Sequence, residues 1–350
     1  MLINLRNALW GGGKKPYWGL YFEAEETNCV VNMTTTGTPP AATFEVSPDG
    51  LSNWTSFDPA NGVTLAAIGD RVYFRAGAGG NTAMASGTSA YRSFTLSKKS
   101  KSGGSIMSLL DGTNANLATV PSYGFARLFR NCAKLTSAPL LPATSIGTHC
   151  YREMFERTGL IVAPDLPATT IGSLAYYMMF GDCTALTTSM ARLPATTLAV
   201  QCYTYMFNSC RNLETFPELP AVSLANNCYE AMFARCSKMT QAPALNATTL
   251  ANNCYSNMFL NCTSLAQSPY LPATSVPSAS SYNAMFNGCT SLESVSVALA
   301  SWPTGGFTNW LNNTKATGTF TCPSSLGTDA DITRGVNYCP TGWTVSNPAA

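Results

Sequence analysis

Charged side chains are scarce in this chain, at 11% of 350 residues, against about a quarter in ordinary globular proteins. Lys and Arg number 20 and Asp and Glu 18, which leaves a net charge of +2. This balance excludes the basic footprint that nucleic-acid binding requires. The basic cluster Lys98, Lys99 and Lys101 stands beside Gly103-Gly104, which indicates a solvated linker rather than a phosphate-binding patch.

Histidine is almost absent, because His149 is the only one. A Ser-His-Asp site could form only there, and no CxxC pair or phosphate-loop motif occurs. Glu153 and Glu156 lie near one another, but Arg152 and Arg157 lie beside them, a pattern typical of a solvated charged face. We therefore predict no catalytic residues, no cofactor and no metal site, and a chain that is not an enzyme.

Long apolar runs are also lacking. No stretch of 18 apolar residues occurs, so we expect no membrane-spanning helix. The opening sequence MLINLRNALWGGGKK has only a short apolar stretch and no small-residue cleavage site, and it does not predict a Sec signal peptide. If the protein acts outside a cell, we expect it to leave by another route, such as lysis.

What the chain does contain is a repeat of about 26 residues between residues 120 and 295. A Met-Phe pair marks each copy, with Leu128-Phe129 as a degenerate first one. The marker phenylalanines are Phe155, Phe180, Phe207, Phe233, Phe259 and Phe286. This regular period predicts about seven turns of a solenoid with these rings in its structural core. A solenoid provides an extended surface, which favours binding over catalysis.

Each copy combines a helical pattern with an extended segment. Tyr255, Met258, Phe259 and Cys262 have the i, i+3, i+4, i+7 spacing of an apolar helical stripe, and Asn252-Asn253 can cap that helix. Leu-Pro-Ala-Thr recurs in phase at 141–144, 166–169, 193–196 and 271–274, with variants at 219–222 and 245–248. Because proline cannot donate within a ladder, it marks the side or the start of a short strand. The sequence therefore predicts an α+β repeat solenoid.

Most of the 13 cysteines fall in two columns of the repeat. One column lies five residues before the marker phenylalanine and the other three residues after it: Cys150, Cys202, Cys228 and Cys254, then Cys132, Cys183, Cys210, Cys236, Cys262 and Cys289. Ala175, Ser281 and Thr158 replace cysteine in other copies, which a required ligand or disulfide would not allow. We interpret the thiols as small buried packing residues. Disulfides between repeats and metal sites are the alternatives, and the sequence leaves open whether Cys322 and Cys339 pair.

An apolar arm precedes the rest of the chain at residues 1–17. Leu2, Leu5 and Leu9 recur at helical spacing with Trp10 beside them, and three glycines then break any helix. One interpretation is a terminal helix that packs on its own protein. The other is a docking peptide that anchors this chain on a larger assembly.

Residues 18–97 read as a small β-sandwich module. Strand signals at 43–46 and 53–55 flank the Pro48-Asp49-Gly50 turn and predict a hairpin. Strands at 63–65 and 72–74 are expected to pair around Gly69-Asp70, and residues 91–96 offer one more strand. Residues 98–119 are expected to form a linker and N-terminal cap, 120–295 the solenoid, and 296–350 a C-terminal cap, since an open solenoid end would expose core.

The repeat unit L-P-A-T-x-L-x-x-x-C-Y-x-x-M-F-x-x-C-x-x-L resembles the BspA-type leucine-rich repeat over about half the chain. Ile146-Gly147, Ile171-Gly172 and the cysteine columns keep the family pattern closely, while Met-Phe stands where Ala-Phe is usual. The resemblance implies the solenoid fold. It also implies a surface protein, because family members are mostly adhesins of gut and oral bacteria and some resemble receptor-binding fibres of their phages.

These features favour a phage virion fibre or receptor-binding protein located on the particle. The arm residues Leu2, Leu5, Leu9 and Trp10 would dock on other virion proteins, and the solenoid would bind a host surface glycan or protein. A bacterial surface adhesin, located on the cell surface, is the alternative, and a glycan-acting enzyme is disfavoured. Tyr177, Tyr205 and Tyr270 are the candidate ligand contacts. Fibres are often homo-oligomers, but no heptad or collagen repeat predicts this here.

Overall fold

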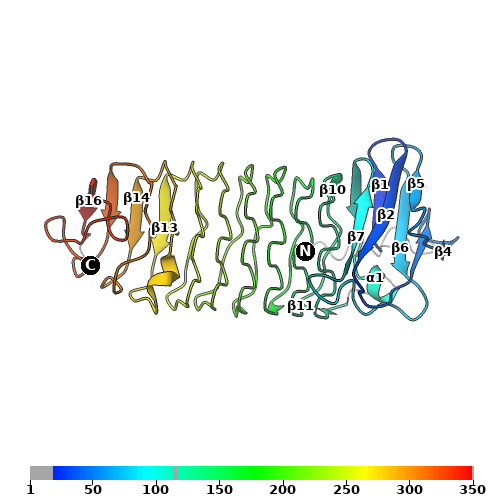
Figure 1. The fold of residues 1–350 in the computed structure, drawn as a ribbon, viewed down its shortest axis with the longest axis horizontal. Helices are drawn as coiled ribbons and strands as arrows, with labels where there is room; N and C mark the ends of the chain where they lie inside the picture. Colours follow the sequence, from blue (N-terminus) through cyan, green and yellow to red (C-terminus); the bar gives the residue numbers. More distant parts are fainter. Residues whose placement is uncertain (1–18, 113–116, 349–350) are drawn as a thin grey trace, which may run out of the picture.

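The computed structural model describes residues 19–112 and 117–348. The chain forms a rod with a small two-sheet module at its N-terminal end and a solenoid along the rest (Figure 1). The strands are β1 (Tyr21–Ala24), β2 (Cys29–Thr36), β3 (Phe44–Ser47), β4 (Thr55–Ser56), β5 (Val63–Leu65), β6 (Arg71–Ala76), β7 (Tyr91–Leu96), β8 (Ser100–Gly103), β9 (Thr119–Val120), β10 (Leu135–Ser137), β11 (Ser145–Ile146), β12 (Thr170–Ile171), β13 (Gln267–Leu271), β14 (Ser294–Val297), β15 (Gly318–Thr321) and β16 (Trp343–Ser346). In this described part the helices are α1 (Ser108–Asp111) and the 3-10 helix η1 (Ala279–Tyr282).

The N-terminal module has one six-stranded sheet, in the order β10-β8-β1-β6-β3-β4, and one three-stranded sheet, β5-β2-β7. The predicted hairpin is confirmed, because β3 pairs with β4 in antiparallel register. The predicted pairing of the strands around Gly69-Asp70 is wrong, since β5 pairs with β2 while β6 pairs with β1 and β3. The alternation of polar and apolar residues fixed which segments are strands, but it carried no information on their partners.

The module and the solenoid share one core and one ladder. Phe94 of β7 packs on Phe22 of β1, with ring centroids 4.8 Å apart, and stacks on Phe129, the first marker ring, at 5.5 Å. Strand β8 is antiparallel to β1 and parallel to β10. Residues 98–104, which composition assigned to a linker, therefore contain the strand that starts the solenoid ladder and covers its first turn.

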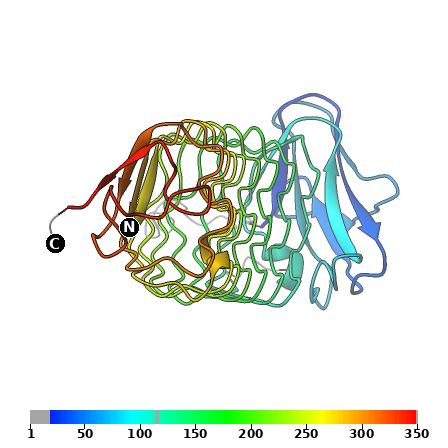
Figure 2. The same cartoon turned by 60° about the vertical axis from the view of Figure 1, so that its left-hand side comes forward.

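The solenoid has about nine turns rather than seven. We number the coils 1 to 7 by their marker rings, Phe129, Phe155, Phe180, Phe207, Phe233, Phe259 and Phe286. The ladder then continues through β14, β15 and β16, which pair in parallel beyond the end of the Met-Phe period. Figure 2 shows the coils stacked around one common interior. The Met-Phe marker is lost in the last turns because Trp310 follows Phe286 in the backbone ladder.

The predicted helix of each repeat is wrong, and with it the α+β class. The segment around each marker ring, here called the turn segment, is a run of consecutive turns. In coil 4, Gln201, Tyr205 and Ser209 have φ of 56°, 58° and 62°, so every fourth residue is left-handed. Asn253, which was expected to cap a helix, has φ 54° in the same role. A left-handed third residue is the requirement of a type II turn.

Each turn segment satisfies its backbone in two alternating ways. Met206 N donates to Tyr203 O at 3.1 Å within the coil, while Phe207 N donates to Met232 O of the next coil at 2.9 Å. Buried backbone groups must be paired, and this alternation pairs them without helix or strand. Side chains then enter the core as pairs that recur every four residues. Over one short segment that spacing matches i, i+3, i+4, i+7, which is why it resembled a helical stripe.

The left-handed positions predict an unusual response to glycine. Ala284 is half-buried with φ 47°, a conformation that costs an L-residue about 1–2 kcal/mol. We expect Ala284→Gly to stabilise the fold by about 1 kcal/mol, since glycine adopts this region freely. Ala251, also half-buried, lies outside the left-handed set, and Ala251→Gly should destabilise by about 0.5–1 kcal/mol. Urea unfolding followed by circular dichroism measures both, and equal signs would contradict the argument.

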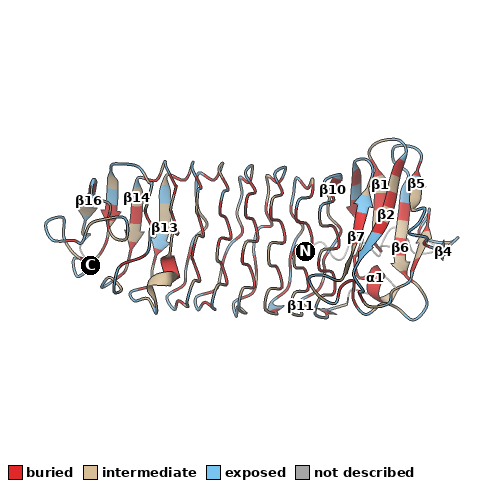
Figure 3. Cartoon of the chain, viewed as in Figure 1, coloured by how far each residue is buried: buried red, intermediate tan, exposed pale blue. Residues whose placement is uncertain are grey.

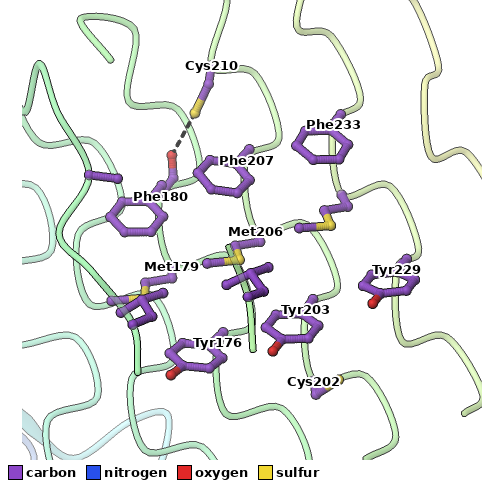
Figure 4. Close-up of a cluster of buried hydrophobic side chains, with 14 of the residues drawn as sticks. Tyr176, Met179, Phe180, Cys202, Tyr203, Met206, Phe207, Cys210, Tyr229 and Phe233 are labelled. Carbon is purple, nitrogen blue, oxygen red and sulfur yellow. Dashed lines mark hydrogen bonds between the residues drawn. The ribbon is translucent and has the colours of Figure 1, made fainter. Parts of the chain in front are cut away.

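The interior consists of stacked columns of identical side chains (Figure 4). Buried residues recur along every coil of the rod (Figure 3). The marker rings from Phe155 to Phe286 are fully buried and stack at 5.3–6.0 Å between centroids, with interplanar angles of 5–10°. A parallel column of tyrosines runs beside them from Tyr151 to Tyr282. Such rings bury about 150–250 Å² each, so they are a large part of the apolar surface that each coil buries.

All 13 cysteines are buried free thiols, in keeping with their interpretation as packing residues. The column that follows the marker ring also donates hydrogen bonds between coils. Cys210 Sγ donates to Phe180 O at 3.0 Å (Figure 4), and Cys236 and Cys262 repeat this bond to Phe207 and Phe233. Thr158, which holds this column in coil 2, makes a different bond, because its hydroxyl donates to Phe155 O of its own coil at 2.9 Å. A small side chain with a thiol or hydroxyl donor therefore fits this column.

The C-terminal end of the ladder is closed by two side chains. Val345 N of β16 donates to Asp329 Oδ1 at 2.9 Å, and Arg334 Nη1 donates to Trp343 O at 2.7 Å. Asp329 and Arg334 also pair with each other at 2.8 Å. The side chains of Asp329 and Arg334 thus occupy backbone groups of β16 that a further strand would otherwise bind. Without them, the exposed strand edge could pair with another chain.

We expect the double substitution Asp329→Ala, Arg334→Ala to produce concentration-dependent association of the rod, because it leaves the edge of β16 unpaired. Sedimentation velocity over a concentration series measures this directly. The matched control is the double substitution Glu214→Ala, Lys238→Ala. It removes an exposed ion pair whose charged atoms are 3.9 Å apart, and this pair does not lie on a strand edge. Unchanged sedimentation of the first variant would show that other groups protect the edge.

Candidate functional site

No group of three metal-ligating side chains gathers anywhere in the described residues. No helix in the same part of the chain is long and apolar enough to cross a membrane. Since each turn segment uses its inward residues for the core, its outward residues are free to vary from coil to coil.

The outward residues of coils 1 to 3 form a network of ion pairs. Arg127 and Arg152 each place Nε 2.8 Å from a Glu153 oxygen, and Arg130 Nε lies 2.5 Å from Glu156. The side chains of Glu153 and Glu156 are only 5% and 2% exposed. The expectation of a solvated charged face is therefore wrong: the carboxylates are buried beneath their arginines. Arg127 and Glu153 are 26 residues apart, so opposite charges one repeat apart were the available signal.

Two of the candidate ligand contacts lie side by side above this network. The Arg152 guanidinium carbon lies 4.2 Å from the centroid of the Tyr177 ring. Tyr177 meets the Tyr205 ring edge-on, with 5.7 Å between centroids and 72° between planes. Both rings are half-buried. Because Glu153 holds Arg152 from below, the three side chains form a supported row across coils 2, 3 and 4.

The surroundings keep the phenol groups of Tyr177 and Tyr205 uncharged. Burial raises the pKa of Tyr177, and Glu153, Glu230 and Glu156 raise it further while Arg152 opposes them. Burial and then Glu230 also raise the pKa of Tyr205. Both phenols therefore stay protonated at neutral pH and act as donors and acceptors of hydrogen bonds. Rings with a polar tip suit the recognition of sugars or of polar protein surface.

Tyr270 does not belong to this row. It lies on β13, on the strand side of coil 6, and is 56% exposed. Leu2, Leu5, Leu9 and Trp10, the predicted docking residues, lie outside the described residues. Of the predicted contacts, Tyr177 and Tyr205 thus form one pair and Tyr270 is a separate exposed ring. The predicted docking arm lies outside the described residues.

His149, the only histidine of the chain, lies against an aromatic ring. Its ring stacks on Tyr123 at 4.7 Å, and its Nδ1 has no hydrogen-bond partner in the described part of the chain. Burial lowers its pKa, and the Arg152 charge lowers it further while Glu153 opposes this. The imidazole is therefore neutral at pH 7, and among the described residues no serine or acid is hydrogen-bonded to its Nδ1.

Two solved structures are similar to this chain, and both are leucine-rich repeat proteins. One, from Bacteroides ovatus, is 15% identical to this chain and has a TM-score of 0.27. The matched region covers 65% of this chain and 72% of the Bacteroides chain. The other, from T. pallidum, is 15% identical and has a TM-score of 0.26. Its matched region covers 66% of this chain and 79% of the T. pallidum chain. No family model and no curated protein matches the sequence. Superpositions this loose transfer no residue roles, so the assignments below rest on this chain's own residues.

Proposed function

We propose that this chain is a non-enzymatic binding protein, a phage virion fibre or receptor-binding protein whose solenoid binds glycan or protein on a host cell surface. The observation that carries the proposal is the Arg152–Tyr177–Tyr205 row, an aromatic surface supported from below by buried ion pairs. A rod with its first turn covered by a separate module suits a chain held at one end. The N-terminal arm would contact other virion proteins.

A bacterial surface adhesin is the second candidate, because the same row would serve it equally well. The two differ in where the chain is located and not in how it binds. Mass spectrometry of purified phage particles from the source community tests the location. Peptides of this chain in the particles would support the virion fibre, and their presence only in bacterial surface fractions would favour the adhesin.

Binding is tested with the fluorescently labelled full chain on bacteria from the same community. We expect Tyr177→Ala and Tyr205→Ala each to weaken cell binding about tenfold, a typical effect of removing an aromatic contact. Ile68→Ala is the control, because Ile68 is 68% exposed but lies in the N-terminal module. Binding that is unchanged in both tyrosine variants would remove the row from the proposal.

A further inference from the structure

The strand ladder of the solenoid is interrupted on both sides of coil 5. In this described stretch, no backbone hydrogen bond joins residues 240–247 to coil 4 or to coil 6. Between coils 3 and 4 the ladder is present, because Leu193 N donates to Glu218 O at 3.1 Å, and β13 pairs with β14. Among the described residues, the corresponding segments of coils 1 and 2, residues 134–143 and 159–168, are also not joined to each other. Within this stretch Ala244 and Asn246 are exposed, so a ligand can reach them, whereas Leu245 and Ala247 are buried.

A bulky side chain lies between coils 4 and 5 beside this stretch. Phe216 occupies a column that holds Ala163 in coil 2 and Ala242 in coil 5. Its ring meets Phe233 of coil 5 edge-on, with centroids 5.5 Å apart and planes at 87°. The ring thus reaches from coil 4 towards coil 5, and the adjacent Pro217 has no N–H to offer the ladder.

A groove of about 350 Å³ lies at this break. Its apolar lining includes Phe216, Pro217, Pro220 and Pro243, and Asn246 contributes an amide. Glu218 also lines it, with a side chain that is 77% exposed. No lysine or arginine lines the groove, which disfavours phosphate or carboxylate ligands. Its volume is at the lower end for small-molecule sites, which suits a single sugar ring.

Asn246 is where the chain departs from its own repeat. The same column holds Pro142, Pro167, Pro194 and Pro272 in other coils. Asn246 is exposed, and its side chain makes no hydrogen bond within the described residues. The missing proline, the added phenylalanine and the open ladder thus coincide at one place. Two columns of the repeat change beside one groove, which makes this groove the candidate site.

We propose that this groove binds the acetamido group of an N-acetylated amino sugar. The methyl group would pack against Phe216 and the proline rings. The amide would exchange hydrogen bonds with the Asn246 side chain and with the backbone of the exposed Ala244 and Asn246, and Glu218 would accept from a sugar hydroxyl. This rests on the proposed function only in that the solenoid binds surface glycan, and it names the sugar class.

The test is calorimetric titration of the full chain with tri-N-acetylchitotriose. Cellotriose, which has the same linkage and ring without acetamido groups, is the matched ligand control. We expect binding of the acetylated sugar and at least about tenfold weaker binding of cellotriose, since two amide hydrogen bonds and a buried methyl are lost. Bacterial peptidoglycan fragments and host-type N-acetylglucosamine glycans, compared in the same titration, distinguish the sources of this sugar.

The variants keep the fold. Asn246→Pro restores the residue that other coils carry and removes the amide and one N–H, and Phe216→Met introduces the residue that Met190 supplies in coil 3. Both should weaken binding of tri-N-acetylchitotriose about tenfold. Pro167→Asn, which places asparagine in the same column of coil 2, should leave it unchanged. Equal binding by wild type and Asn246→Pro, or equal affinity for cellotriose, would overturn the assignment.

These outcomes are separable from the proposed function. Cell binding that depends on Tyr177 and Tyr205 but shows no response to either trisaccharide would leave the binding protein standing and remove only the acetamido groove. If the wild-type chain bound tri-N-acetylchitotriose but did not bind cells, the acetamido groove would stand and the proposed cell-binding function would be removed.

Discussion

Phe233→Ala should destabilise the solenoid by about 3–5 kcal/mol, the range for deleting a fully buried aromatic ring. Phe233 is 0% exposed. It stacks between Phe207 at 5.6 Å and Phe259 at 6.0 Å, and it meets Phe216 at 5.5 Å. The backbone ladder of the turn segments fixes the spacing of the coils, so the cavity cannot collapse. Urea unfolding monitored by circular dichroism gives the change in unfolding free energy.

The position of Phe233 in the middle of the rod adds a second expectation. Solenoid stability is a sum of coil and interface terms, so a cavity in coil 5 should split the unfolding transition into two. Thr248→Ala, at an exposed position of the same coil, is the control and should change stability by less than about 0.5 kcal/mol. A Phe233→Ala effect no larger than that of the control would mean that the core is not close-packed there.

The period and the core could be predicted because each coil repeats the same residues. A Met-Phe pair at a constant interval places its ring against the ring of the next coil, whatever the local backbone. The local backbone could not be predicted from the apolar pattern, since pairs every four residues and a helical stripe coincide over one short segment. The missed signal was the asparagine at Asn253, Asn257 and Asn261, a residue that tolerates the left-handed region.

The candidate site was predictable only in part. Tyr177 and Tyr205 lie about one repeat apart, so subtracting the period predicts that they are neighbours. The same operation predicts that Tyr270 is not, because it falls in the strand segment. The groove at Phe216 leaves two traces in the sequence, the bulky Phe216 in a column that holds alanine in coils 2 and 5, and Asn246 in the proline column. That the two residues border one groove could not be predicted, because it depends on how the coils pack.

Glu153 is the residue whose loss should most weaken the junction between the module and the solenoid. Its carboxylate pairs with Arg127 and Arg152, and Arg130 lies 3.3 Å away. Arg127 also lies over the ring of Tyr91 in the module, 5.0 Å from its centroid. Removing the carboxylate leaves these partly buried guanidinium groups short of a counter-ion, which costs about 3–5 kcal/mol for a buried pair.

Glu153→Gln keeps the shape and removes the charge, so it isolates this term, and its cost should depend on pH in a defined direction. Burial alone would raise the pKa of Glu153, but the hydrogen bond and charge of Arg127, together with Arg152, outweigh it and leave the pKa lowered. The stabilisation is therefore fully present above the unfolded value of about 4.3 and is lost as the pH falls through the folded pKa. The stabilities of the wild type and of Glu153→Gln should differ by a constant amount between about pH 5 and pH 8 and should converge in acid.

Glu218→Gln is the matched control, because the exposed Glu218 carboxylate lies 3.9 Å from Arg192 and should contribute less than about 1 kcal/mol at any pH. Thermal unfolding across this pH range measures both, and a Glu153→Gln difference that persists at low pH would assign the effect to packing rather than to charge.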